Sequence, residues 1–307
     1  MILLGILAAS GAGAGAVSVA GYFGGGYTGS AVSTVDKFAF PDDSRTTLAS
    51  GLSSDRREAA PMSNVNVAGY VAGGQDATFF TTVDKFAFPS DSRTTLGTGL
   101  SIARGYFAGM SNSGVAGYAA GGGSGTFFTT VDKFAFPSDS RSTLGTGLSG
   151  ARLQATGMSN SGVAGYAAGG LEGSVVATVD KFAFPSDSRT TLGTGLSSAR
   201  RGVAGMSNSG VSGYAAAGWL GSTVSTVDKF AFPSDSRTTL GTGLSLARLS
   251  AGGISDSGVA GYVGGGSTDP TKLVTVDKFA FPSDSRTTLA TGLSLARDAP
   301  AGFQDSL

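Results

Sequence analysis

The chain has 307 residues, and its 21 lysines and arginines balance 21 aspartates and glutamates, so the formal net charge is zero. It contains no cysteine and no histidine, which excludes disulfides, thiolate nucleophiles, histidine bases and metal sites held by those side chains. No segment carries a run of like charge that would follow a nucleic acid or an anionic membrane. We therefore expect no nucleic acid partner, no cofactor and no metal.

The N-terminal segment, residues 1–20, is apolar and rich in glycine and alanine. Its apolar start, residues 1–7, is interrupted by Gly5 and is too short to span a bilayer, and no lysine or arginine precedes it as in a signal peptide. The glycine-rich residues 11–16 lack the following lysine of a phosphate-binding loop. We expect residues 1–20 to form an extra strand or a contact arm beside a single domain, residues 21–307, with no membrane span.

The rest of the chain is a tandem repeat. The string VDKFAF followed by proline begins at Val35, Val83, Val131, Val179, Val227 and Val276, so the period is 48 residues with one extra residue before the last copy. The 51 glycines are more than twice the share of roughly 7% that is typical of proteins. Within such a period, they indicate tight turns and closely packed strands rather than disorder.

One period, taken from the third copy, contains four strand-like segments. In chain order they are residues 117–122, 130–136, 142–148 and 153–158, which we name strands B, C, D and A. Asn, Asp, Ser, Gly and Pro gather between A and B and between C and D, as in turns. The strands combine apolar and small residues without strict alternation, which is typical of strands buried on both faces. Four such strands in 48 residues have the dimensions of a propeller blade.

Closure of the ring depends on which end of the chain supplies the missing strand A. Strands B, C and D occur six times, but residues 8–19 and residues 297–306 both align with strand A. The C-terminal segment keeps the Ala-Arg pair of the repeat, so we expect it to complete the first blade beside residues 21–52. Such closure removes an open sheet edge. The prediction is an all-β, six-bladed propeller of four-stranded antiparallel blades, closed by a C-terminal strand in the first blade.

Across the copies a Gly-Gly pair ends strand B, a variable loop and the VDKF segment follow, then a Leu-rich strand, and an Ala-Arg pair precedes strand A. Over about residues 21–303 this pattern resembles the kelch repeat, with VDKF in the place of the family's VEVY. Two positions depart from the family pattern. The tryptophan that the family has in strand D is absent, and its place falls near Arg45 or Thr46 and their equivalents. In the fifth copy, Ala217-Gly218 stands in place of the glycine pair. The near-identical copies also resemble kelch-like reading frames of marine bacteriophages. That resemblance implies a component of the virion surface or tail fibre, located on the virion or outside the cell, with the cytoplasm as the alternative.

Several charged residues recur in every copy. They are an Asp-Lys pair in strand C, beginning with Asp36 and Lys37, a turn ending in Asp-Ser-Arg, and an arginine before strand A, beginning with Arg56. One hypothesis is a functional ring of charge. We favour a structural role, in which Asp and Arg satisfy each other and backbone groups between blades while the lysine heads lie in water. No second acid lies near enough for glycoside hydrolysis, and no acidic spacing typical of a calcium loop is present.

Differences between copies gather in the B-to-C stretch and around the Ala-Arg pair that joins D to A. In a four-stranded antiparallel blade these two connections leave on the same side, so one face of the disc varies and the other is uniform. Loops on a rigid scaffold commonly carry binding residues. We predict ligand contacts from Tyr27, Asp76, Tyr106, Phe107, Glu172, Arg201, Trp219 and Asp269. The variable face also carries Gln75, Arg57, Glu58, Gln154, Leu220 and Lys272. Trp219, the single tryptophan, offers a stacking platform, or else covers the gap left by Ala217.

Three functions fit these features. The first is a non-enzymatic module that binds a protein or glycan, with other virion proteins as further partners. The second is a structural protein that stacks through its uniform face and N-terminus. The third is an enzyme acting on sugars, because kelch-type propellers sometimes host catalysis. Without histidine or cysteine a copper oxidase cannot be assembled, so we expect no enzymatic activity.

Overall fold

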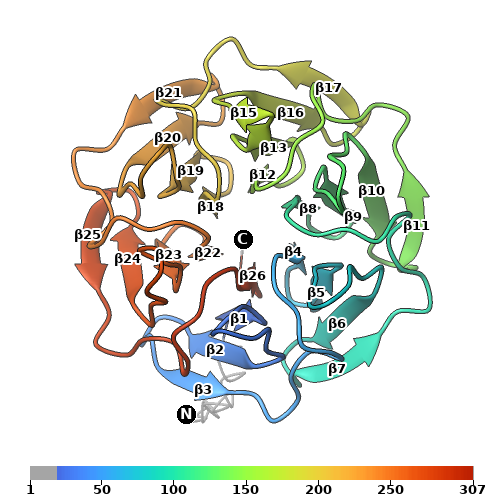
Figure 1. The fold of residues 1–307 in the computed structure, drawn as a ribbon, viewed down its shortest axis with the longest axis horizontal. Helices are drawn as coiled ribbons and strands as arrows, with labels where there is room; N and C mark the ends of the chain where they lie inside the picture. Colours follow the sequence, from blue (N-terminus) through green and yellow to red (C-terminus); the bar gives the residue numbers. More distant parts are fainter. Residues whose placement is uncertain (1–18, 307) are drawn as a thin grey trace, which may run out of the picture.

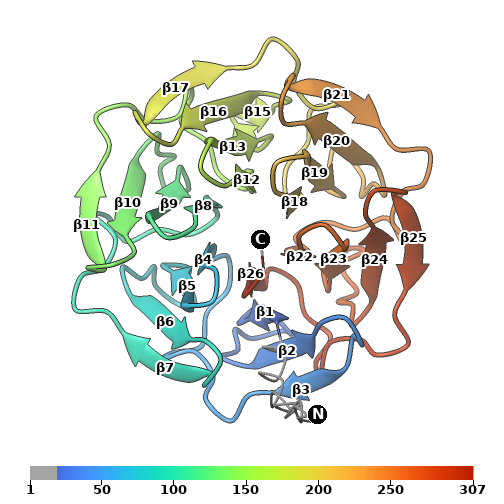
Figure 2. The ribbon, with the colours of Figure 1, turned by 180° about the vertical axis from the view of Figure 1, so that it is seen from behind.

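The computed structural model describes residues 19–306, in which six four-stranded antiparallel sheets surround a central axis (Figure 1). We number these sheets as blades 1 to 6. Strand A lies nearest the axis in each blade and strand D at the rim, as both views of the disc show (Figures 1 and 2). The predicted all-β, six-bladed propeller is therefore confirmed.

The strands of blades 1 to 3 follow the predicted repeat from the axis outward. Blade 1 contains β26 (Ala301–Gln304), β1 (Ala20–Gly24), β2 (Val35–Ala39) and β3 (Arg45–Thr47). Blade 2 contains β4 (Ala60–Asn64), β5 (Ala68–Ala72), β6 (Val83–Ala87) and β7 (Ser92–Thr95). Blade 3 contains β8 (Ala108–Asn112), β9 (Ala116–Ala120), β10 (Val131–Ala135) and β11 (Ser140–Thr143).

Blades 4 to 6 repeat the arrangement, with one addition. Blade 4 contains β12 (Thr156–Asn160), β13 (Ala164–Ala168), β16 (Val179–Ala183) and β17 (Ser188–Thr191), and its B-to-C stretch forms a separate small hairpin of β14 (Leu171–Glu172) and β15 (Ser174–Val175). Blade 5 contains β18 (Ala204–Asn208), β19 (Ser212–Ala216), β20 (Val227–Ala231) and β21 (Ser236–Thr239). Blade 6 contains β22 (Gly252–Asp256), β23 (Ala260–Gly264), β24 (Val276–Ala280) and β25 (Ser285–Thr288).

The C-terminal strand closes the ring. Strand β26 pairs antiparallel with β1, with Phe303 opposite Tyr22, so the first blade is built from both ends of the described chain. The prediction that residues 297–306 supply this strand is confirmed. The other part of the prediction, an extra strand or contact arm in residues 1–20, falls almost wholly on residues 1–18, which lie outside the described residues.

Strand D is shorter and begins earlier than the sequence predicts. In the third copy it spans Ser140–Thr143 and pairs with β10 from Ala135↔Ser140 to Asp132↔Thr143, whereas the prediction was residues 142–148. After Leu144 the chain turns inward toward the next blade, and the Leu148 backbone N–H donates to Thr129. The segment predicted as the second half of strand D is therefore the crossing to the next blade.

Side chains interlock between neighbouring blades. Each of the six hydrophobic clusters joins one blade to the next, and the tyrosine of strand B stacks on a phenylalanine of the next blade, as Tyr70 does on Phe136 with ring centroids 5.1 Å apart. Nearer the axis, the space shrinks until only glycine fits. A Cβ on Gly157 would collide with the carbonyl oxygen of Gly109 in the preceding blade. Large aromatic rings outside and glycine inside give each blade the wedge shape that a closed ring needs.

The repeated charged residues form ion pairs within each blade and between neighbouring blades. The fully buried Arg56 and Asp84 form an ion pair of 2.8 Å, and the equivalent pair is present in the other blades. This confirms the structural pairing expected for Asp and Arg, although the pair lies within one blade and not between blades. The expectation that the lysine heads lie free in water was wrong, because Lys37 pairs at 2.7 Å with Asp91 of the next blade, which also accepts the Tyr22 hydroxyl hydrogen. The aspartate of each Asp-Ser-Arg turn repeats this contact around the ring.

Candidate binding site at the mouth of the central channel

The central channel opens on the variable face through a ring of six residues, each placed two positions after the invariant arginine. All six have left-handed backbone conformations, with φ between 52° and 65°. We call this set the mouth ring: Glu58, Tyr106, Gln154, Gly202, Ser250 and Ala299. Only one of the six is glycine, so five side chains are held in a conformation that L residues rarely adopt. Strain of this kind persists only where the surrounding structure over-determines it.

A closed cycle of backbone hydrogen bonds provides that restraint. The N–H of each mouth-ring residue donates to the carbonyl of the equivalent residue in the preceding blade, over 2.6 to 3.2 Å. Tyr106 donates to Glu58, Gln154 donates to Tyr106, and the cycle closes where Glu58 donates to Ala299. The backbone of the mouth is therefore a six-fold symmetric ring, whatever side chains it carries.

The side chains of the mouth ring break this symmetry. Blades 2, 3 and 4 present Glu58, Tyr106 and Gln154, whereas blades 5, 6 and 1 present the small residues Gly202, Ser250 and Ala299. One half of the mouth therefore carries long polar side chains and the other half is open. A ligand at the open half would meet hydrogen-bonding groups on one side only.

A second circle of residues surrounds the mouth ring. In every blade a residue of the D-to-A connection forms a β-bridge with a residue of the B-to-C stretch, such as Arg57 with Gln75 and Arg201 with Trp219. We call these pairs the collar: Asp298–Tyr27, Arg57–Gln75, Gly105–Gly123, Leu153–Leu171, Arg201–Trp219 and Leu249–Ser267. The prediction that these two connections share one face is confirmed by this pairing.

In blade 5, the collar links Trp219 to the mouth. The Arg201 guanidinium lies 4.8 Å from the centre of the half-buried Trp219 ring, and its Nη1 donates to the Gln154 side-chain oxygen over 2.9 Å. Trp219 therefore lies on the variable face, as predicted, but one face of its ring is covered by Arg201 and is not a free stacking platform. The same guanidinium joins the collar of blade 5 to the mouth ring of blade 4.

In blade 1, a similar cluster surrounds Tyr27. The Arg57 guanidinium lies 4.1 Å from the centre of the Tyr27 ring, and the Lys272 ammonium lies 5.4 Å from it. Lys272 also pairs with Asp298 at 2.7 Å. Cations held over aromatic rings gain about 0.5–1 kcal/mol at exposed sites. Charged side chains are thus held in place around the mouth rather than extended into solvent.

Two titratable groups of the mouth ring are shifted by their surroundings. Burial and, to a lesser extent, nearby Asp298 raise the pKa of Glu58 to about 8, although Arg57 and Arg201 act in the opposite direction. Burial also raises the pKa of Tyr106, whose hydroxyl is hydrogen-bonded to the Gln75 side chain. At neutral pH both groups therefore keep their protons. The Tyr106 hydroxyl accepts the Gln75 amide hydrogen, so its own proton and that of Glu58 can be donated to a ligand. Together with Arg201 and the Gln154 amide, they can hold a polar ligand.

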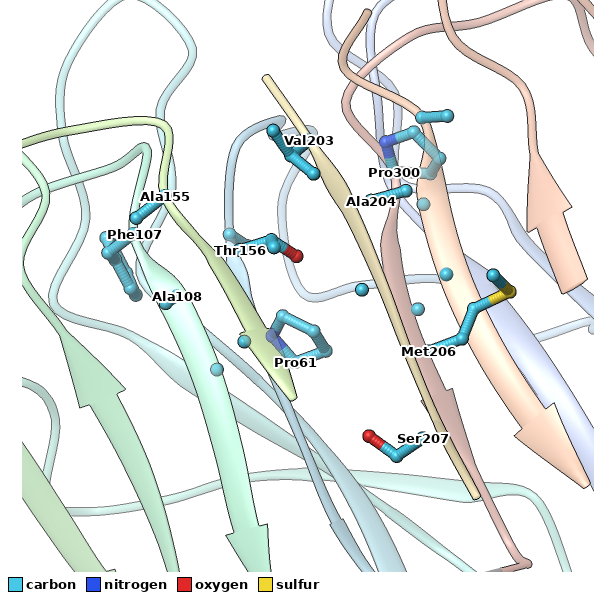
Figure 3. Close-up of a pocket in the computed structure, with 18 of the residues that line it drawn as sticks. Pro61, Phe107, Ala108, Ala155, Thr156, Val203, Ala204, Met206, Ser207 and Pro300 are labelled. Carbon is cyan, nitrogen blue, oxygen red and sulfur yellow. The ribbon is translucent and has the colours of Figure 1, made fainter. Parts of the chain in front are cut away.

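Below the mouth ring lies a cavity of about 130 Å³ that follows the axis between the innermost strands. Pro61, Thr156, Val203 and Pro300 surround this space (Figure 3). Deeper in the channel, serines bridge the blades, and the Ser111 N–H donates to the Ser159 hydroxyl over 2.8 Å. The equivalent bonds are present at four other junctions. The channel wall is therefore nearly the same in every blade, with Pro61, Thr156 and Gln304 as exceptions, whereas the mouth differs in every blade.

The predicted site residues fall into three groups. Tyr27, Tyr106, Arg201 and Trp219 gather in the mouth ring and the collar. Asp76, Glu172 and Asp269 are exposed in the B-to-C stretches farther out. Phe107 lines the cavity but is only 6% exposed and packs into the core between blades 2 and 3, so it presents little surface to a ligand.

Sequence reasoning missed the mouth ring as a set, and with it Ser250 and Asp298. The available signal was positional, because each of these residues stands one or two positions after an invariant arginine. Among residues 19–306, no group of three or more Asp or Glu could hold a metal ion. In the same range, no helix is long and apolar enough to span a membrane.

The comparisons with known proteins agree with the architecture. No protein-family model matches the chain, and no curated protein matches its sequence. Many solved structures share the fold. One, titled "Structure of YjhT", superposes with a TM-score of 0.69 at 15% identity, covering 87% of this chain and 96% of that one. At this identity the likeness shows the β-propeller fold alone, and the kelch and bacteriophage resemblances stay predictions.

Proposed function

We propose that this protein is a non-enzymatic recognition module whose ligand, a glycan or a segment of a protein, docks on the variable face over the mouth of the central channel. The propeller fold is compatible with a binding role, since it presents loops from a rigid scaffold. The observation that carries the proposal is the contrast at the mouth, where a symmetric backbone ring is formed by six different residue types.

That contrast has a physical reason. A residue required by the fold recurs in all six blades, as Arg56 and Asp84 do, because every blade meets the same packing problem. The mouth ring repeats its backbone conformation but not its side chains. Its side chains are therefore free of the repeat's structural demands and available for a ligand.

The bacteriophage resemblance adds a context to this proposal. A module of this kind would serve as a receptor-binding part of a tail fibre or of the virion surface, with a saccharide of the host envelope as its ligand. The donors Glu58, Tyr106 and Arg201 and the acceptor oxygen of Gln154 suit the hydroxyl groups of a saccharide.

The test is binding of the purified protein to a panel of immobilised oligosaccharides, measured by biolayer interferometry. The repeats supply variants that the fold already accepts, because Ser250 occupies the position of Tyr106 in another blade and Ser267 that of Trp219. We expect Tyr106→Ser and Trp219→Ser each to weaken binding at least about tenfold, the loss expected of an aromatic contact residue. Val163→Ser, an exposed apolar position on the uniform face, is the matched control.

Each outcome bears on the proposal. Loss of binding in the two mouth variants with retention in the control supports the variable face. Equal binding by all four proteins, or loss only in Val163→Ser, overturns it. Binding to a protein of the host envelope in place of any saccharide would keep the face and identify the ligand as a protein.

A further inference from the structure

The cavity below the mouth ring is lined by residues of all six blades, whose innermost strands surround the axis (Figures 1 and 2). We call it the axial cavity. Below the mouth ring its wall has a layer of five glycines and Pro61, and then a layer of five serines and Gln304. Its volume is about 130 Å³. At about 10–15 Å³ for each water molecule, this space holds roughly ten waters, which is close to the space that one hexose unit needs.

The wall of the axial cavity decides how a ligand enters. Because neighbouring blades close it on every side, a molecule reaches it only along the axis. The small mouth-ring residues of blades 5, 6 and 1 leave a passage beside the long side chains of blades 2 to 4. A polymer therefore enters by an end, and the middle of its chain stays outside. A protein loop, which runs in and out again, is too wide for a space of this size.

Backbone N–H groups of the glycine layer are available to a molecule in the axial cavity. In the serine layer, the Ser111 N–H donates to the Ser159 hydroxyl of the next blade over 2.8 Å. Gly109 lies two residues before Ser111, so its N–H is on the same edge of strand β8. The residue of the next blade at that level is Gly157, which has no side chain to accept the bond. Such backbone groups require water or a ligand as their partner.

Thr156 adds a side-chain hydroxyl at the same depth. Only 7% of this residue is exposed, and its hydroxyl points into the axial cavity (Figure 3). A Cβ on Gly205 of the next blade would lie 2.6 Å from its oxygen. The fold does not require this hydroxyl, because Ala60, Ala108 and Ala204 stand at the equivalent positions of other blades. Thr156 therefore departs from the repeat at a place that faces the channel, as the mouth ring does.

The axial cavity has no group that would neutralise an ion. Among residues 19–306, those that line it include no lysine, arginine or aspartate, and the glutamate at its mouth, Glu58, keeps its proton at neutral pH. An ion that left water for this space would lose its hydration without gaining a counter-ion. Both ends of a peptide chain are charged, whereas the end of a neutral saccharide is not. The axial cavity therefore favours a saccharide end.

We infer that the ligand is a saccharide chain whose uncharged terminal residue enters the axial cavity end-on, while the following residues lie over the mouth ring and the collar. The inference rests on the proposed function, because it uses the same mouth, and it adds which part of the ligand is recognised. Hydroxyl groups of the terminal ring would meet Thr156 and the glycine N–H groups. Its apolar faces would meet Pro61, Val203 and Pro300 (Figure 3).

The first experiment is competition with single sugars. The natural protein is bound to the immobilised oligosaccharide that it prefers, and methyl glycosides of glucose, galactose, mannose and N-acetylglucosamine are added in turn. Each glycoside presents one neutral ring, with a methyl group in place of the rest of the chain. We expect the glycoside that matches the terminal residue to release the protein. The uronic acid form of that sugar, which carries a carboxylate, should compete at least about tenfold less well.

The second experiment removes a contact that only an inserted end can make. Thr156→Ala introduces the residue that three other blades already have at this position, so we expect the fold to be kept. Binding of the matching glycoside should weaken about three- to tenfold, the effect of one lost hydrogen bond. Thr190→Ala, at an exposed position of strand D, is the matched control and should bind as the natural protein does.

The outcomes separate this inference from the proposed function. Competition by a neutral glycoside, together with weaker binding by Thr156→Ala, supports entry of a chain end. No competition by any glycoside, equal competition by the uronic acid, or undiminished binding by Thr156→Ala overturns it. If Tyr106→Ser loses binding while Thr156→Ala keeps it, the proposed function stands and the ligand lies across the mouth without entering. A protein ligand also overturns the inference, and a chain that binds neither oligosaccharide nor protein overturns both proposals.

Discussion

Arg56 and Asp84 form an ion pair of 2.8 Å in which neither side chain has any exposed surface. Arg56 precedes strand A of blade 2, and Asp84 lies on strand C of the same blade. Asp84 also accepts hydrogen bonds from the Ser53 N–H and the Thr95 hydroxyl. Its carboxylate, on strand C, therefore contacts both the segment that enters the blade and strand D. Loss of either charge would leave the other buried without a partner.

We therefore expect Arg56→Met to lower the free energy of unfolding by about 3–5 kcal/mol, the usual cost of breaking a buried ion pair. Guanidinium denaturation followed by circular dichroism measures it. Arg93 provides the matched control because it approaches the same carboxylate, at 3.6 Å, but is 30% exposed. Arg93→Met should change the free energy by less than about 1 kcal/mol. Equal effects of the two substitutions would contradict the assignment of the buried pair as the link that matters.

The approach of neighbouring strands at the axis makes a second prediction. A Cβ on Gly157 would meet the carbonyl oxygen of Gly109, a backbone atom that cannot turn aside. We expect Gly157→Ala to destabilise the protein by about 1–3 kcal/mol, as overpacking does. A Cβ on Gly145 meets nothing within 4 Å, so Gly145→Ala should be neutral or stabilising by up to about 1 kcal/mol. Thermal unfolding of the two variants compares them, and a Gly157→Ala protein as stable as the natural one would disprove the close approach.

Trp219 is the single tryptophan, so its fluorescence reports on the collar of blade 5. Arg201→Leu removes the guanidinium that covers one face of the ring and introduces the residue found at the equivalent positions Leu153 and Leu249. We expect easier quenching of the emission by acrylamide, with the free energy of unfolding lowered by only about 0.5–1 kcal/mol. Arg189→Leu, at the rim, is the control. Unchanged quenching in Arg201→Leu would mean that the guanidinium does not shield the ring.

Glu58 predicts how stability depends on pH. Its pKa is raised from 4.5 to about 8, so the folded state holds a proton that the unfolded chain releases between these values. The stability from this proton is complete below about pH 4.5 and is lost as the pH rises through about 8. Glu58→Gln has no such proton to lose. Its melting temperature relative to the natural protein should therefore rise by about 6 °C between pH 5 and 8 and then level off.

Thermal unfolding at about one-unit steps from pH 5 to 9 measures this difference. Glu172→Gln, which removes an exposed carboxyl from the same face, is the control. A difference between Glu58→Gln and the natural protein that stays constant across the range would show that Glu58 ionises alike in the folded and unfolded states.

The amino-acid sequence by itself determined the blade number, the order of strands, the C-terminal closure and the division into a variable and a uniform face. These features follow from a period that is visible in the chain, because each blade is a local unit that recurs every 48 residues. The structural roles of the buried Arg and Asp also follow from the sequence, because a residue that every blade needs in order to fold recurs in every copy.

Only the tertiary structure decided which residues of different blades meet. Lys37 pairs with Asp91, 54 residues away, and the Glu58 carbonyl accepts the Tyr106 N–H of the next blade, so neither contact is visible as a local sequence pattern. The mouth ring exists only once six blades converge, because its left-handed residues are held by a cycle of bonds between blades. The burial of Phe107 between two blades and the contact of Arg201 with the Trp219 ring are likewise tertiary contacts. Local sequence builds a blade, whereas the site arises from the ring.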